Sequence, residues 1–275
     1  MQDAVDDPGA HRADYPAAAA RDQCRAVLRG DRCDLQVTPG DGTEERGTPT
    51  GTMLLVIDLG ALSGRTFDAV LFDMDGTLID SMAGSLQAWA LWATEHDVDP
   101  AHLADLGGRP AAQVIPGLLT ADRVADALAR IEHLEVLAAA DGIELLPGTA
   151  EALAALPPDR VAIVTSCTRE LLAARLAGSQ LRHPREIVTF DDVEHGKPAP
   201  DPFVLGARRL GFDPARCLAV EDAPAGLASA RAAGCTTLGV GDTHPHAELD
   251  ADAHAPDLSH VRFAAGPDGI TVSAV

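Results

Sequence analysis

Lysine is nearly absent from this chain of 275 residues, which holds 21 Lys and Arg together but only one lysine, Lys197. A composition biased toward Arg and Ala removes dispensable lysines, so the one that remains indicates a role that Arg cannot fill. Aromatic residues are also scarce, at 3%, whereas hydrophobic residues make up 46%. The chain is therefore long and apolar enough for one large domain, or for a domain with a smaller one, around a core of Ala, Leu and Val.

Basic residues are half as many as acidic ones: 21 Lys and Arg stand against 42 Asp and Glu, which gives a net charge of −21. Such a chain repels nucleic acids and anionic membranes, and neither is expected as a partner. A small anionic substrate stays possible, because a metal or a buried cation can reverse the local field. No apolar stretch approaches the roughly 20 residues that span a bilayer, and the N-terminus lacks a signal-peptide pattern. The five cysteines show no zinc-site spacing, so we expect free thiols in a cytoplasmic protein.

Residues 1–52 lack apolar periodicity and are rich in Asp, Gly, Arg, Pro and Thr. This composition predicts a mostly disordered N-terminal extension, with at most a short helix near 17–28. The alternative is that the segment is upstream sequence before a start at Met53.

From residue 67 onward, apolar runs typical of buried strands alternate with helical patterns. The runs lie at 67–73, 160–166, 217–222 and 235–241, with a weaker one at 185–192. Helices are expected at 168–178, 200–211 and 224–234, the last two ending at a glycine. This alternation predicts an α/β fold, a doubly wound, Rossmann-like parallel sheet with helices on both faces.

A helical block without a clear strand interrupts the sheet pattern at residues 82–145, with helical runs at 82–96 and 121–140. Its position directly after the first strand predicts an α-helical cap that overhangs the site. The Rossmann-like core is then expected to comprise residues 67–81 and 146–262.

Polar groups follow several of the predicted strands, at the edge where ligands bind in such sheets. These groups are Asp73 and Asp75, Thr165 and Ser166, Lys197, and Glu221 with Asp222. Each alone has an ordinary explanation as a helix cap or a solvated loop. Their joint occurrence in order indicates one site.

The stretches "FDMDGTL", "VTS", "GKPAPDPF" and "VEDAPAG" resemble the four motifs of the haloacid dehalogenase (HAD) superfamily, and the likeness spans about residues 67–260. The stretches "GRPAAQVI", "LLPGTAEAL" and "DTHPHAEL" resemble a subgroup of sugar-phosphate and polyol-phosphate phosphatases with a helical cap. The resemblance implies a phosphoric monoester hydrolase acting on a small phosphorylated metabolite.

The resemblance also implies a role for each matching position. Asp73 would be the nucleophile that forms an aspartyl phosphate, and Asp75 would protonate the leaving alcohol and then accept a proton from water. Both aspartates could address one ligand, because alternate side chains of a strand share a face. Gly76 would let the backbone turn sharply under the phosphate.

Two carboxylates that face a phosphate require a hard cation between them, and Mg²⁺ prefers oxygen ligands. Asp73, the backbone carbonyl of Asp75, and Asp222 would hold it, with Glu221 bound directly or through a neighbouring ligand. The compact charge of Lys197 would neutralise Asp73 and a phosphate oxygen.

The Thr165 hydroxyl and the Ser166 amide would bind another phosphate oxygen. Arg109, in the insertion, is either a cap residue that reaches the leaving group or an exposed arginine without a role.

Two other functions stay open at this point. A phosphomutase of the β-phosphoglucomutase type is disfavoured, because Ser85 stands where those enzymes carry a cap histidine used in the transfer. A non-catalytic phosphate-binding protein on the same fold is disfavoured by the intact Asp73 and Asp75. Dehalogenases of this superfamily lack the second aspartate, so Asp75 with Gly76 and Thr77 indicates phosphoryl transfer instead. The natural substrate and the oligomeric state stay open.

Overall fold

A parallel six-stranded sheet organises the part of the chain that this computed structural model describes, residues 57–103, 109–140, 142–241, 244 and 248–275. The strand order is β5-β4-β1-β6-β7-β8. The strands are β1 (Ala69–Phe72), β4 (Val161–Val164), β5 (Glu186–Val188), β6 (Cys217–Glu221), β7 (Thr236–Val240) and β8 (Ala253–Ala255). Each predicted apolar run contains one strand, and β8 was not anticipated. The predicted extension at 1–52, its possible helix and the possible start at Met53 lie outside the described residues.

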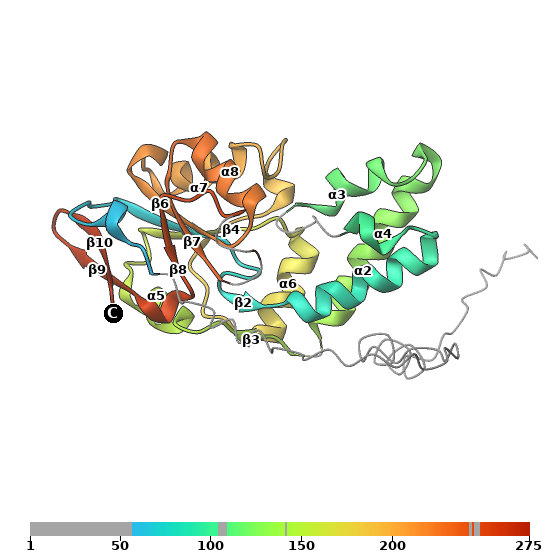
Figure 1. Ribbon diagram of the computed structural model, residues 1–275, viewed down its shortest axis with the longest axis horizontal. Coiled ribbons are helices and arrows are strands. Elements are labelled where there is room, and N and C mark those ends of the chain that lie inside the picture. Colours follow the sequence, from blue (N-terminus) through green and yellow to red (C-terminus); the bar gives the residue numbers. More distant parts are fainter. Residues whose placement is uncertain (1–56, 104–108, 141, 242–243, 245–247) are drawn as a thin grey trace, which may run out of the picture. The chain divides into compact units, whose positions relative to one another are not determined.

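The sheet is apolar on both faces, because alternate residues of each strand point to opposite sides. Val70 and Phe72 of β1 belong to one hydrophobic cluster, and Ala69 and Leu71 belong to the other. Helices α5 (Thr149–Ala155) and α6 (Arg169–Ser179) contribute to the first cluster. Helices α7 (Asp201–Leu210) and α8 (Pro224–Ala233) cover the second, and Figure 1 shows them above the sheet. The predicted doubly wound α/β architecture is confirmed.

The predicted glycine stops of the last two helices are also confirmed. Gly211 follows α7 with φ +83° and Gly234 follows α8 with φ +92°. Both values lie in the left-handed region, where glycine has no Cβ penalty.

The inserted block contains helices α2 (Met82–His96), α3 (Ala111–Val114) and α4 (Ala121–Ala139). They share a hydrophobic cluster of their own, centred on Trp92 and Ile131. Helix α4 packs against both α2 and the core helix α6, which places the block beside one end of the sheet (Figure 1). The limits of the cap at residues 82 and 145 stay a prediction.

A short antiparallel pair was not anticipated in or beside this block. Strand β3 (Glu144–Leu145) pairs with β2 (Ile79–Asp80). Two residues are too few to produce a strand pattern in a sequence, and both residues of β3 are exposed.

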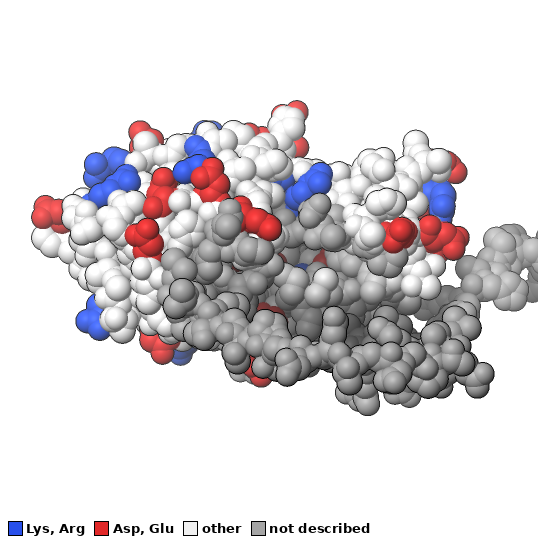
Figure 2. Space-filling view, viewed as in Figure 1, with Lys and Arg blue, Asp and Glu red and all other residues white. Residues whose placement is uncertain are grey.

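A hairpin of β9 (Val261–Gly266) and β10 (Gly269–Ala274) follows the sheet. Phe263 and Ile270 belong to the same hydrophobic cluster as Phe72. The ring of Phe263 meets that of Phe72 edge to face, with the ring centroids 5.7 Å apart. On the face shown in Figure 2, acidic and basic side chains are interspersed over the described surface rather than gathered by sign. None of the described helices is long and apolar enough to cross a membrane.

Candidate active site

The carboxyl ends of β1, β4 and β6 carry the polar side chains that the sequence singled out. Asp73 directly follows β1, Thr165 directly follows β4, and Glu221 ends β6. Backbone hydrogen bonds extend the strand pairing into this edge, from the Asp73 amide to the Val220 carbonyl at 2.9 Å and from the Thr165 amide to the Val188 carbonyl at 2.9 Å. The parallel sheet therefore gathers these groups at one edge.

The turn after β1 explains why two acids are followed by glycine. Met74 is fully buried, and Gly76 adopts φ +83°. A Cβ atom at Gly76 would lie 2.2 Å from Asp222 Oδ2, so no larger residue fits. The Thr77 hydroxyl donates to Asp222 Oδ1 at 3.2 Å, which fixes Asp222 against this turn.

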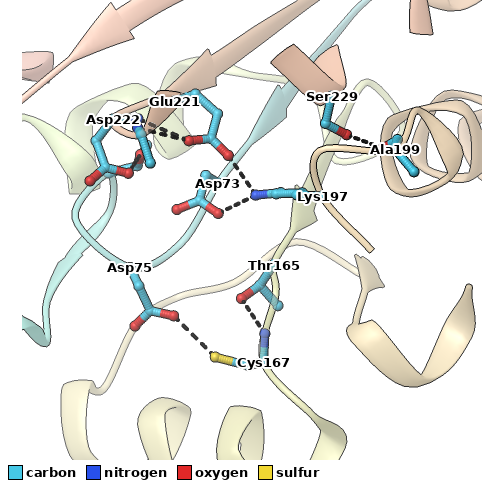
Figure 3. A network of polar contacts seen from close by, with 11 residues as sticks. Asp73, Asp75, Thr165, Cys167, Lys197, Ala199, Glu221, Asp222 and Ser229 are labelled. Carbon is cyan, nitrogen blue, oxygen red and sulfur yellow. Dashed lines mark hydrogen bonds and ion pairs between the residues drawn. The ribbon is translucent and has the colours of Figure 1, made fainter. Parts of the chain in front are cut away.

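Lys197 bridges two buried carboxylates. Its Nζ lies 2.5 Å from Asp73 Oδ1 and 2.5 Å from Glu221 Oε1, and only 1% of the side chain is exposed (Figure 3). Burial acts to lower the pKa of Lys197, but its ion pairs with Asp73 and Glu221 outweigh burial and hold that pKa above its usual value. The ammonium is therefore charged and fixed in place.

Glu221 is engaged on both of its oxygens. Oε1 meets Lys197, while Oε2 accepts the backbone N–H groups of Asp222 and Ala223, each at 3.1 Å. Gly226 of α8 makes room for this carboxylate, since a Cβ there would lie 1.7 Å from Glu221 Oε1. These contacts make Glu221 a group that orients Lys197.

The residues present fit a hard divalent cation. Asp73, Glu221 and Asp222 each offer an oxygen, and these oxygens lie within 4.8 Å of one another. Three buried carboxylates therefore lie close to one another, and the Lys197 ammonium contacts two of them, Asp73 and Glu221. Burial raises the pKa of Asp73 to about 8 against the pull of Lys197, and the charges of Glu221 and Asp75 add to the rise. Binding of an oxygen-preferring cation such as Mg²⁺ would lower the pKa of Asp73 and so favour its ionised form.

The Asp75 carboxylate belongs to a different set of contacts. In Figure 3 it points away from Asp73 and toward Cys167, whose Sγ lies 3.0 Å from Asp75 Oδ2. The Ser81 hydroxyl donates to Asp75 Oδ1 at 2.6 Å, and Arg175 Nη1 lies 2.7 Å from the same oxygen. Only the backbone of Asp75 was predicted to meet the metal, and its carboxylate is outside the three-residue cluster.

Arg175 is the group that the sequence analysis missed. It lies on α6, is 5% exposed, and also approaches Glu135 Oε1 of α4, at 3.7 Å. The available signal was its spacing: Leu171 and Arg175 stand four residues apart and share the buried face of the helix. A charged residue on an apolar helical face indicates a buried partner.

Thr165 and Ser166 begin the loop after β4. Thr165 is 2% exposed, and its hydroxyl accepts the Cys167 backbone N–H at 3.1 Å. Ser166 lines a cavity of about 190 Å³, and residues of α4 also line it. Lys197 and the Thr165–Cys167 loop both border the site in Figure 3.

The structure does not place Arg109 beside the polar side chains of the candidate active site. Its side chain is exposed, and among the described residues no hydrogen bond or ion pair joins it to the site. The adjacent segment does approach the site, because Gln113 Nε2 donates to the Gly196 carbonyl at 3.3 Å, next to Lys197. The predicted role of Arg109 stays a prediction.

Comparison with known proteins agrees with this geometry. A family model of haloacid dehalogenase-like hydrolases matches residues 67–234, more than half of the chain. The chain belongs to this family. Hexitol phosphatase A of Escherichia coli (strain K12) is 38% identical over 208 residues, covering 72% of this chain and 95% of that protein.

Two further relatives point the same way. Fructose-1-phosphate phosphatase YqaB of the same organism is 34% identical over 184 residues, covering 63% of this chain and 96% of that protein. The crystal structure of CbbY from Rhodobacter sphaeroides in complex with phosphate superposes with a TM-score of 0.61 at 26% identity, covering 70% of this chain and 95% of that one. The expected enzyme class, a phosphoric monoester hydrolase, is confirmed by this HAD-like family and its phosphatase relatives.

Proposed function

We propose that this HAD-like hydrolase is a Mg²⁺-dependent phosphatase of small sugar or polyol phosphates that works through an aspartyl phosphate on Asp73. The observation that carries the proposal is the buried pairing of Lys197 with Asp73, beside Asp222. A carboxylate held by one ammonium and set beside further carboxylates suits the nucleophile of a two-step phosphoryl transfer. The phosphatase relatives support the substrate class.

The residues divide the reaction between them. Asp73 attacks phosphorus, and Lys197 offsets the charge of the nucleophile and of a phosphate oxygen. Asp73, Asp222 and the Asp75 carbonyl would hold Mg²⁺, which supplies charge neutralisation at the phosphate when bound. Glu221 meets Lys197 through Oε1 and accepts two backbone N–H groups through Oε2, so it orients the ammonium and adds negative charge beside the cation.

Proton transfer falls to Asp75. It gives a proton to the leaving alcohol oxygen as the phosphorus–oxygen bond breaks, and it later takes a proton from the water that attacks the aspartyl phosphate. Ser81 and Arg175 both meet Asp75 Oδ1, so the carboxylate does not rotate freely. The Thr165 hydroxyl and the Ser166 amide complete the phosphate site.

Phosphate release from a panel of hexitol, fructose and glycerol phosphates, measured with Mg²⁺ and with EDTA, tests this proposal. We expect turnover that requires Mg²⁺ and that falls by at least about 1,000-fold in Asp73→Asn. Asp126→Asn on the exposed side of α4 is the matched control and should behave as wild type. Transfer of phosphate between positions of a sugar, with little release to water, would instead indicate a mutase. The Ser85 position argues against that outcome, because its hydroxyl donates to Glu135 at 2.6 Å and offers no imidazole.

A further inference from the structure

The cavity beside Ser166 has an asymmetric charge lining. Its volume is about 190 Å³, and apolar side chains such as Leu128, Ile131, Leu171 and Phe190 form much of its wall. The charged side chains among its lining residues are Glu132 and Glu135, both acidic and both on α4. Three residues apart, they stand on one face of the helix.

The two glutamates differ in what compensates their charge. Glu135 Oε1 accepts the Ser85 hydroxyl at 2.6 Å and lies 3.7 Å from Arg175 Nη2, so a cation faces it. Glu132 Oε1 accepts the hydroxyl of Thr168, and within the described part of the chain no ion pair joins Glu132 to a cation. Glu132 therefore brings an uncompensated carboxylate to the cavity, and Thr168 fixes its orientation.

The cavity adjoins the proposed phosphate site. Ser166, in the proposed phosphate site, is part of the cavity wall, and α4 forms another part of it. A space of about 190 Å³ holds several water-sized groups, which suits a small polyol. Carboxylate oxygens accept hydrogen bonds from hydroxyl groups, and apolar walls suit the C–H faces of a carbon chain.

We propose that this cavity is the leaving-group subsite and that Glu132 makes the enzyme select neutral, polyhydroxylated leaving groups over those that carry a carboxylate or a second phosphate. This inference rests on the proposed phosphatase function. A second anion in the cavity would face the Glu132 charge in a partly desolvated space. At about 6 Å and an effective dielectric constant of about 20, that repulsion corresponds to roughly a 100-fold loss in kcat/KM.

A matched pair of substrates tests the inference. Sorbitol-6-phosphate and 6-phosphogluconate differ at the far end, where one carries a hydroxymethyl group and the other a carboxylate. Wild-type enzyme should prefer the neutral substrate by about 100-fold in kcat/KM. Glu132→Gln should lower this ratio by about 10-fold or more, mainly by improving turnover of the acid. Glu132→Asp keeps the charge and should keep most of the preference.

The control is Glu151→Gln, which removes an exposed carboxylate from α5 and should leave the ratio unchanged. A wild-type ratio near one, or an identical ratio in Glu132→Gln and wild type, overturns the inference. A preference for the acid that disappears in Arg109→Gln also overturns it and assigns the subsite to that arginine. If the Gln variant is too unstable to assay, the wild-type ratio and Glu132→Asp still decide. Absence of phosphate release from both substrates and from the hexitol, fructose and glycerol phosphates of the panel is a separate result that contradicts the proposed function itself.

Discussion

Replacing Lys197 by arginine tests why the chain keeps a single lysine. The Lys197 ammonium fits between Asp73 and Glu221, 2.5 Å from each, and the ring of Phe203 lies 5.3 Å from Nζ. A guanidinium carries the same charge on a larger, planar fork, and the side chain is 1% exposed. The variant must therefore displace a carboxylate or move its own charge.

A displacement of about 1 Å at this point costs on the order of 100-fold in rate. We expect at least that loss in kcat/KM for Lys197→Arg in a steady-state assay of phosphate release. Arg208→Lys, the reverse exchange at an exposed position of α7, is the control and should leave activity intact. Lys197→Met removes the charge and leaves two buried carboxylates without their cation, which should lower the free energy of unfolding by about 3–5 kcal/mol.

Two results would contradict this role of Lys197. The first is near-normal turnover of Lys197→Arg, because a surface charge would tolerate the exchange. The second concerns acetylation, which is selective here because Lys197 carries the only lysine amine of the chain. Because its ammonium is charged and 1% exposed, Lys197 should react far more slowly in the native enzyme than in the unfolded chain, and equal rates in the two states would place it outside the site.

Two further variants probe the groups around the aspartates. Arg175→Gln should disturb Asp75, the proposed proton donor, and so slow turnover of alkyl phosphates more than that of p-nitrophenyl phosphate, whose leaving group needs little protonation. Equal losses of activity on both substrates would contradict a role of Arg175 in positioning Asp75. Gly226→Ala should lower kcat/KM by about 10-fold or more, because its Cβ displaces Glu221 from Lys197. Gly117→Ala, where a Cβ meets open space, is the matched control, and equal activity of the two variants would contradict this reading.

The strand ends explain why much of the site was predictable. Asp73, Thr165 and Glu221 each end or follow an apolar run, and a parallel sheet brings such positions together whatever their separation in the chain. Lys197 stood out by its rarity and by its place in the stretch "GKPAPDPF". The resemblance to known motifs then supplied the expected roles, which geometry such as the Lys197 bridge supports.

Contacts between elements were not predictable in the same way. The approach of Arg175 to Asp75 depends on how α6 lies against the turn after β1, which no local pattern records. The β9–β10 hairpin was missed because its exposed positions include small apolar residues, such as Ala264, that blur the alternation. Strand β3 is stabilised by its partner rather than by its own two residues.

The most direct test of the aspartyl-phosphate mechanism is to look for phosphate on Asp73 during the first turnover. Enzyme mixed with radiolabelled hexitol phosphate and Mg²⁺ is quenched in acid within milliseconds, digested and analysed for labelled peptides. A two-step transfer through Asp73 predicts a hydroxylamine-sensitive label on the peptide that contains Asp73, absent from Asp73→Asn. Release of phosphate by the wild-type enzyme without any protein-bound label at the earliest times, or a label that persists in Asp73→Asn, would contradict it.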